Sequence, residues 1–295
     1  MKVKDTLGDK LFSAFCMTLV ILVTFICIYP LWLVVIYSVS DPDVVNAGKV
    51  WLWPVGINWN AYKEVFSRPD LMKGYWNTIT QTVFGTAVNM IMTIPAAYAL
   101  SKKRLKGRGF FMALIVFTMY FSGGLIPNFI NLKRLGLLNT WWVFGLCGAV
   151  SAHNLIIART FFASGVPHEL EDAAEIDGCS TAGVFFKIVL PLSKAMLGVI
   201  MLYYVVGHWN NFGTALYYTP QSTEYWPLQM VIRNLLRTLN KLAQSGDEAA
   251  LLYYTKIFDM IKYAVVVVAA VPILILYPFL QKYFNKGVMM GSVKG

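Results

Sequence analysis

Six long apolar runs constrain the fold of this chain more than any other feature of its sequence. Each is about as long as the roughly 20 residues that a helix needs to cross the hydrocarbon core of a bilayer. A bilayer admits only helices or closed barrels, and runs this long lack the ten-residue alternation of a barrel. We therefore predict an all-α, polytopic membrane protein with six transmembrane helices, at about 11–39, 75–100, 109–132, 141–163, 195–217 and 262–284.

The composition supports a membrane protein: 57% of the residues are hydrophobic and 14% are charged, against about 45–50% and 25% in soluble domains. The first run follows Lys2, Lys4 and Lys10. It exceeds the roughly 7–15 residues of a signal-peptide core, and no small-residue cleavage site closes it. We expect a retained helix and a single membrane domain over residues 1–295.

A basic cluster after the second run predicts the orientation. Its members fall within seven residues: Lys102, Lys103, Arg104, Lys106 and Arg108. Such clusters stay in the cytoplasm. Six spans then place both termini and the loop 164–194 inside, and the loops at about 40–74 and 218–261 outside. The net charge of +10 fits basic helix ends that meet anionic lipid, and an acidic substrate is also compatible with it. The aromatic–basic interleaving of a nucleic-acid groove is absent, so we expect no nucleic-acid partner.

The sequence contains none of the short patterns that would indicate catalysis. It has no G-x-x-x-x-G-K-[ST] phosphate loop, so an ATPase would be a separate polypeptide. Its three histidines lack the spacing of a metal site, its four cysteines include no CxxC pair, and no G-x-S-x-G elbow occurs. We therefore expect no catalytic site, no metal and no cofactor in this chain.

Residues 167–192, PHELEDAAEIDGCSTAGVFFKIVLPL, form a docking element between two apolar runs. Pro167 suits a first helical position. The helix dipole favours the negative charge of the acidic residues in the first turn, and the two alanines that follow offer a face with small side chains that another protein could approach closely. Gly178 can end that helix, and a second helix should run from about Ser180 to Leu190, where Pro191 stops it. The alternative to a docking role is an ordinary amphipathic helix at the membrane interface. The predicted docking residues are Glu169, Leu170, Glu171, Asp172, Ala173, Ala174, Ile176, Asp177, Gly178, Ile188, Leu190 and Pro191.

The spacing of Asp172-Ala173-Ala174, Gly178, Ile188 and Leu190-Pro191 resembles the cytoplasmic loop of permease subunits in ATP-driven (ABC) importers. That family usually has Glu where this chain has Asp172, which carries the same charge on a side chain one methylene shorter. Further segments resemble the MalG-type permeases of carbohydrate importers, namely Pro95–Ser101, Trp209-Asn210, Trp226-Pro227-Leu228 and the tail GVMMGSVKG. The tail and Ser122–Pro127 are most similar to a subgroup that handles complex or acidic oligosaccharides such as alginate.

The resemblance implies a type I importer permease in the bacterial inner membrane that moves carbohydrate by alternating access. Its implied partners are a second homologous permease, two cytoplasmic ATPase subunits that use ATP and Mg, and a periplasmic binding protein. The tail residues implied to contact the ATPases are Gly287, Gly291, Ser292 and Lys294. An ion-coupled carrier and a non-transporting scaffold or sensor are the rival interpretations.

Polar residues inside the apolar runs suggest a substrate path. In the second run, polar and small residues recur at intervals of four, three, four and four from Thr78 to Thr93, which places them on one helix face. The fifth run carries four adjacent residues with polar groups, His208, Trp209, Asn210 and Asn211. At that depth, polar groups are costly unless they are paired or hydrated. Helix packing is the alternative for both. The candidate path residues are Thr82, Asn89, Asn154, His208, Trp209 and Asn210.

The outer loop at 218–261 is long enough to carry structure of its own. The stretch Leu228 to Leu242 reads as a helix with its leucines on one face. It can cap the bundle or contact a binding protein, and the candidate contact residues are Trp226, Arg233, Arg237 and Lys241.

Overall fold

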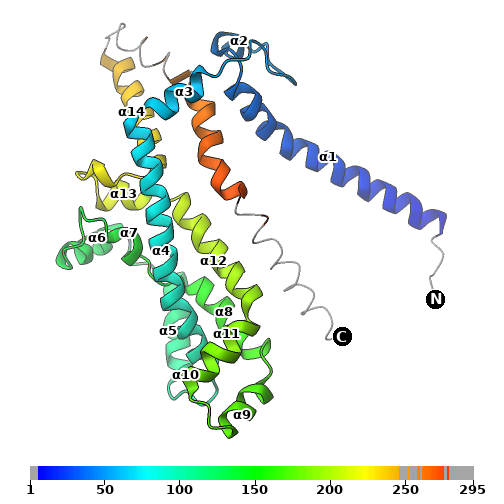
Figure 1. Cartoon of the computed structure of the whole chain (residues 1–295), viewed down its shortest axis with the longest axis vertical. Coiled ribbons are helices and arrows are strands. Elements are labelled where there is room, and N and C mark those ends of the chain that lie inside the picture. The colour runs from blue at the N-terminus through cyan, green and yellow to red at the C-terminus, as the bar shows by residue number, and fades with distance from the viewer. Residues whose placement is uncertain are drawn as a thin grey trace. The chain divides into compact units, whose positions relative to one another are not determined.

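The computed structural model describes residues 6–245, 252, 255, 258, 259, 261–275 and 278. Their regular structure is entirely helical (Figure 1), which confirms the predicted all-α class. Contacts divide the chain into two compact units, Met1–Pro69 with Leu235–Val271, and Asp70–Asn234 with Pro272–Gly295.

The first unit contains one very long helix, α1. A capping box between Thr6 and Asp9 starts α1. Near the other end of α1, the rings of Tyr37 and Tyr263 lie 5.1 Å apart. Asp259 accepts hydrogen bonds from Asn46 and from Lys262, at 3.1 and 2.6 Å. The helices of this unit are α1 (Leu7–Ser38), α2 (Pro42–Asn46), α3 (Asn60–Ser67) and, as far as Val271, an apolar helix over Ile261–Ile275.

The second unit is organised around α4 (Pro69–Ser101), which runs along its length in Figure 1. A further helix, α14 (Leu228–Ser245), starts in this unit and agrees with the helix predicted over Leu228 to Leu242. The other helices are α5 (Arg108–Tyr120), α6 (Leu125–Arg134), α7 (Val143–Leu146), α8 (Ala152–Ser164), α9 (His168–Ile176), α10 (Thr181–Val184), a π-helical turn (Phe185–Val189), α11 (Leu190–Leu192), α12 (Lys194–Trp209), α13 (Gly213–Tyr218) and a 3₁₀ turn (Thr223–Tyr225).

Several of the predicted spans are bent or broken. Among the described residues, α1 and α4 are long and apolar enough to cross a membrane unaided. The third predicted span bends by 119° between α5 and α6, where Gly124 has a φ of 86°. The fourth breaks between α7 and α8, next to Gly148 with a φ of 77°. The prediction of continuous helices over 109–132 and 141–163 was therefore wrong. Hydropathy reports how apolar a segment is, but not whether its backbone bends. The number of crossings stays a prediction.

The polar face of α4 binds the broken backbone between α7 and α8. The Asn89 amide nitrogen donates to the Gly148 and Ala149 carbonyls at 3.0 and 2.8 Å. Its oxygen lies 2.5 Å from Nε2 of His208 on α12, so the imidazole donates this bond. Thr93 bonds the Tyr204 hydroxyl at 2.6 Å. Irregular backbone at membrane depth must be satisfied within the protein, and Asn89 of α4 supplies two such bonds at the break in the fourth predicted span.

We expect Gly85→Ala to destabilise the second unit. A methyl group on Gly85 would lie against the His208 ring, well inside contact distance, so the ring would have to move and lose its bond to Asn89. We expect a loss of about 1–3 kcal/mol, typical of overpacking, seen as a lower Tm of the purified protein in detergent. Gly207→Ala is the matched control, because nothing lies within 4 Å of the added carbon. Equal Tm values for the two variants would contradict this account.

Candidate functional site

The docking element forms a short helix, α9, at one end of the second unit (Figure 1). Pro167 precedes its first residue, one position earlier than predicted, with φ −60° and ψ 126°. The helix ends at Ile176, and Gly178 follows with a φ of 78°, the left-handed conformation expected after a helix end. The Cys179 and Gly178 N–H groups close the end by bonding the Ala174 and Glu175 carbonyls at 2.9 and 3.1 Å.

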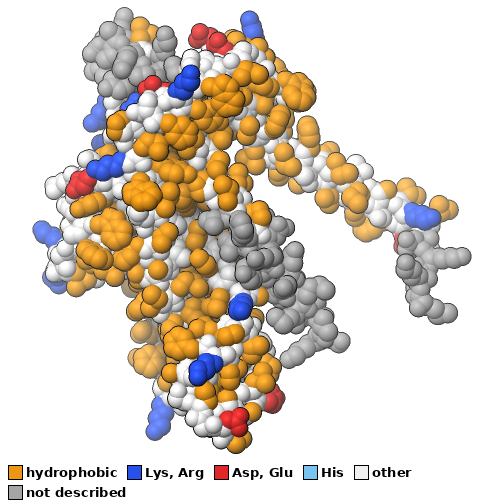
Figure 2. Space-filling view, in the orientation of Figure 1, with side chains coloured by type: hydrophobic (Ala, Val, Ile, Leu, Met, Phe, Trp, Pro, Cys, Tyr) orange, Lys and Arg blue, Asp and Glu red, His pale blue; other side chains and the backbone are white. Residues whose placement is uncertain are grey.

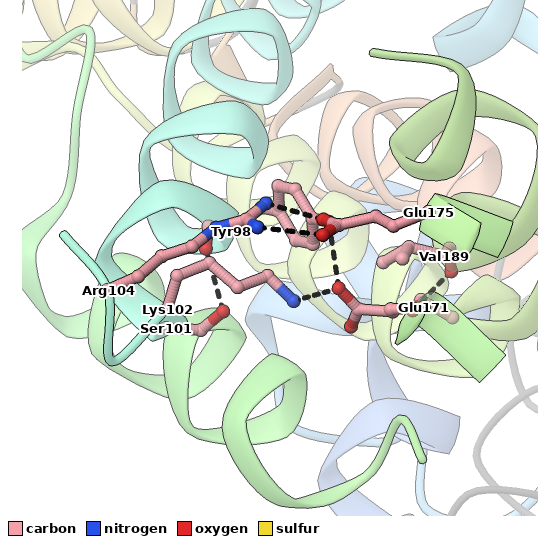
Figure 3. A network of polar contacts seen from close by, with 8 residues as sticks. Tyr98, Ser101, Lys102, Arg104, Glu171, Glu175 and Val189 are labelled. Atoms are coloured by element: carbon pink, nitrogen blue, oxygen red, sulfur yellow. Dashed lines mark hydrogen bonds and ion pairs between the residues drawn. The ribbon is translucent and has the colours of Figure 1, made fainter. Parts of the chain in front are cut away.

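One face of α9 is attached to the end of α4 by a buried ion pair. Glu171 is 5% exposed. One of its oxygens pairs with Lys102 and accepts a 3.0 Å hydrogen bond from the Tyr98 hydroxyl (Figure 3). The Lys102 ammonium also lies 4.3 Å from the centroid of the Tyr98 ring. The other Glu171 oxygen is buried without a hydrogen-bond partner in the described structure, so Lys102 carries most of the compensation for this charge.

A second ion pair lies one helical turn along α9. Arg104 makes two contacts with the Glu175 carboxylate, at 2.7 and 3.0 Å (Figure 3). These hydrogen bonds hold the pKa of Glu175 below its ordinary value. Both side chains are substantially exposed, so this pair contributes less than the buried one. Two residues of the basic cluster, Lys102 and Arg104, therefore pair with acidic residues of α9. The sequence analysis used this cluster only to predict the orientation in the membrane and did not predict these contacts.

The opposite face of α9 is exposed in the part of the chain that the structure describes. It comprises Glu169, Asp172, Ala173 and Ile176, all exposed and spaced as one helical face. Ile176 is 85% exposed on this face, so the face offers an apolar side chain between acidic ones.

The two alanines of α9 do not share this exposed face, contrary to expectation. Ala174 is buried in the core that joins α4, α8 and α12. Ala173 remains exposed on the outer face. Leu170, Asp177 and Gly178 are exposed as well. Within α9, the predicted docking residues therefore separate into an anchoring set, Glu171 and Ala174, and an outward set.

The second helix of the loop continues past Pro191, where it was predicted to stop. Pro191 lies inside α11, and the chain turns by 82° at Ser193. The π turn already shifts the hydrogen bonding, because the Leu190 N–H bonds the Phe185 carbonyl, and proline is tolerated in a first helical turn. Ile188 and Leu190 pack against the core, while Pro191 is exposed.

The candidate path residues gather partly along the line where α4 meets α12. Thr82 and Trp209 line an apolar cavity of about 650 Å³, and the Trp209 ring meets Tyr75 edge-on with centroids 6.1 Å apart. Asn89 and His208 bond each other beside it. Asn154 is buried on α8, whereas Asn210 is exposed and its amide donates to the Val206 carbonyl at 3.1 Å. A role in substrate passage stays a prediction for each.

The candidate residues for binding-protein contact lie around the start of α14 and along it. The Trp226 indole donates to the Thr219 carbonyl at 3.1 Å, and the Arg233 guanidinium lies 5.0 Å from the Phe212 ring centroid. Arg237 and Lys241 are exposed. The tail residues Gly287, Gly291, Ser292 and Lys294 lie outside the described residues. In the part of the chain that is described, no group of three His, Cys, Asp or Glu side chains is arranged to hold a metal.

Comparison with known proteins gives consistent matches over most of the chain. The family described as "Binding-protein-dependent transport system inner membrane component" matches residues 71–290. Protein LplC of Bacillus subtilis (strain 168) is 42% identical over 270 residues, which cover 92% of this chain and 90% of LplC. The polygalacturonan/rhamnogalacturonan transport system permease protein YtcP of the same organism is 40% identical over 288 residues, covering 97% and 99%.

A solved structure extends the likeness to three dimensions. It is the crystal structure of a bacterial ABC transporter involved in the import of the acidic polysaccharide alginate. One of its chains matches with a TM-score of 0.85 at 32% identity, over 96% of this chain and 100% of that chain.

We expect Lys102→Met to weaken the attachment of α9. The substitution leaves the buried Glu171 carboxylate without its cation, which typically costs about 3–5 kcal/mol, and should lower the Tm of the purified protein. Arg104→Met breaks only the exposed pair and should leave the Tm nearly unchanged. The double variant Lys102→Met/Glu171→Met should recover much of the loss, because it removes both buried charges. An unchanged Tm for Lys102→Met would show that the pair does not hold α9.

Proposed function

The chain belongs to the family of binding-protein-dependent transport system inner membrane components, and we propose that it is the permease subunit of an ATP-driven carbohydrate importer. It is a transport subunit and not an enzyme. The observation that carries the proposal is the arrangement of α9, with one face anchored to α4 and the other exposed. The fold agrees with that of the alginate importer chain, which has the importer permease fold expected from the sequence.

The geometry of α9 suits a lever between an ATPase and the membrane helices. A partner that moves the outer face of α9 also moves α4, because the Glu171–Lys102 pair and the buried Ala174 join the two helices. α4 carries the polar face that meets α12. Movement at α9 can therefore change the packing of α4 and α12, provided that the ATPase contacts differ between its two states.

The names of the similar proteins support a polymeric carbohydrate as substrate. YtcP is described as a transporter of polygalacturonan and rhamnogalacturonan, and the solved transporter imports the acidic polysaccharide alginate. We extend this to an oligosaccharide or polysaccharide substrate for the present chain, with alginate or another acidic polymer as the more specific candidate.

We further propose the partners and the setting that such a subunit requires. They are a second homologous permease forming a heterodimer, two ATPase subunits that consume ATP and Mg, and a periplasmic binding protein. The permease would cross the inner membrane six times with both termini in the cytoplasm. Judged from the described residues, none of the 13 residues of α5 is buried. A partner permease and lipid would cover this apolar surface.

We expect Ala173→Arg and Ala174→Arg to fail in different ways. Ala173 lies on the outer face, so its Arg variant should fold and insert normally but lose co-purification of the ATPase and lose transport. Ala174 is 9% exposed and packed in the core, so the same substitution there should lower the yield and Tm of the subunit itself. Ala173→Ser is the size-matched control and should keep the ATPase. Normal ATPase binding by Ala173→Arg would rule out this face as the docking site.

Transport by the complete complex tests the function directly. In proteoliposomes that contain both permeases, the ATPases and the binding protein, we expect uptake of acidic oligosaccharides that requires ATP, stops with vanadate and survives an uncoupler. Neutral oligosaccharides of the same length test the preference for acidic substrates. Uptake abolished by the uncoupler would indicate an ion-coupled carrier, and ATPase binding without uptake of any carbohydrate would indicate a scaffold.

A further inference from the structure

The loop after α1 turns back along the helix that it has just left. The carbonyl of Trp51 accepts a 3.3 Å hydrogen bond from the Tyr29 hydroxyl, and that of Leu52 accepts a 2.9 Å bond from the Trp32 indole. Tyr29 and Trp32 lie nine and six residues before Ser38, the last residue of α1. At about 1.5 Å per residue, the segment therefore descends roughly 9–13 Å below the end of the helix.

The chain then returns to the level at which α1 ends. The Val55 N–H bonds the Ser40 hydroxyl at 3.2 Å, and the Asp41 N–H bonds the Val55 carbonyl at 3.1 Å. Three residues later, the Asn58 N–H bonds the Val39 carbonyl at 2.8 Å. Residues 50–58 thus form a dip whose lowest part is 51–53.

The lowest part of this dip presents large apolar side chains outward. Trp51, Leu52 and Trp53 are 69%, 56% and 74% exposed. The Trp51 indole donates to the Gly48 carbonyl at 3.0 Å, so its polar end is bonded within the loop. Trp53 also meets the Trp32 ring edge-on, with centroids 6.4 Å apart. Tryptophan and tyrosine with an apolar body and a satisfied polar end favour the boundary between membrane and water.

The length of α1 places the dip at that boundary. Its 32 residues span about 48 Å, whereas a hydrocarbon core is about 30 Å thick and takes about 20 residues. Counted from Leu11, just after Lys10, twenty residues end at Pro30, next to Tyr29 and Trp32. Only 6% of the most apolar stretch of α1 is buried within the chain, and hydrophobic side chains follow the helix in Figure 2. The Trp32–Trp53 contact makes the dip continuous with this surface.

We propose that residues 51–53 are an interfacial anchor that lies in the lipid headgroup layer on the predicted outer side and contacts lipid, not another protein. The anchor goes beyond the transport function proposed above. Because α1 exceeds the core thickness by several turns, its composition alone does not fix its depth or tilt, and interfacial aromatic residues supply that restraint. The dip holds α1 so that the segment from Leu11 to Tyr29 stays in the hydrocarbon.

Site-directed spin labelling in the assembled transporter tests the depth of the dip. The native cysteines Cys16, Cys27, Cys147 and Cys179 are first replaced by Ala. Single labels are then placed by Leu22→Cys in the middle of α1, Trp53→Cys, Ile57→Cys and Lys63→Cys on α3. Each is measured in phosphatidylcholine–phosphatidylglycerol vesicles for collisions with oxygen, which enters lipid, and with a nickel chelate, which stays in water.

We expect the label at position 53 to lie between those at positions 22 and 63 for both reagents, with nickel collisions several-fold below those at 63. The label at 57 should be nearer to 63, because the chain has returned to the level of Val39. Full nickel access at 53 would overturn the anchor, and exclusion of both reagents would show that protein covers it. If Trp53→Cys does not assemble, Trp51→Cys takes its place with the same expected order.

Discussion

Polar groups at membrane depth have no water to bind, and the second unit depends on the partners that α4 supplies for them. Asn89 satisfies two backbone carbonyls exposed by the break between α7 and α8, and Thr93 bonds the Tyr204 hydroxyl. At the end of the same helix, Tyr98 hydrogen-bonds Glu171, and the following Lys102 pairs with it. One helix therefore supports the irregular backbone and also anchors the docking element.

This arrangement explains why a short helix such as α9 can act as a rigid connection. An isolated nine-residue helix is too short to be stable alone. α9 is held by a closed C-terminal turn, a buried ion pair and a core alanine, so its outer face is presented in a defined orientation. A protein that binds this face meets a surface whose position follows that of α4.

Local sequence patterns predicted α1, α4, α14 and the turn at Gly178, because apolar runs, helical spacing and glycine conformations depend on near neighbours. They did not predict the bends at Gly124 and beside Gly148, since a glycine in an apolar run also fits a straight packed helix. The continuation of the helix past Pro191 was missed for a similar reason: the π turn that accommodates it is not encoded by a simple spacing. For the candidate path residues, the sequence identified a polar face, and the structure shows which of those groups are paired within the chain.

The sequence by itself determined the helical class, which follows from composition and the length of the apolar runs, and it indicated the family through motifs in several segments. It also located the short helix α9, because an acidic first turn and a terminal glycine are local signals. Only the tertiary structure decided that Glu171 faces α4 while Asp172 faces outward. It also decided that Lys102 serves as the partner of α9, and that residues 51–53 fold back along α1. These outcomes depend on contacts between segments that are distant in sequence or related through a loop of irregular backbone. A periodic pattern records which residues share a face of one helix but not which other segment that face meets.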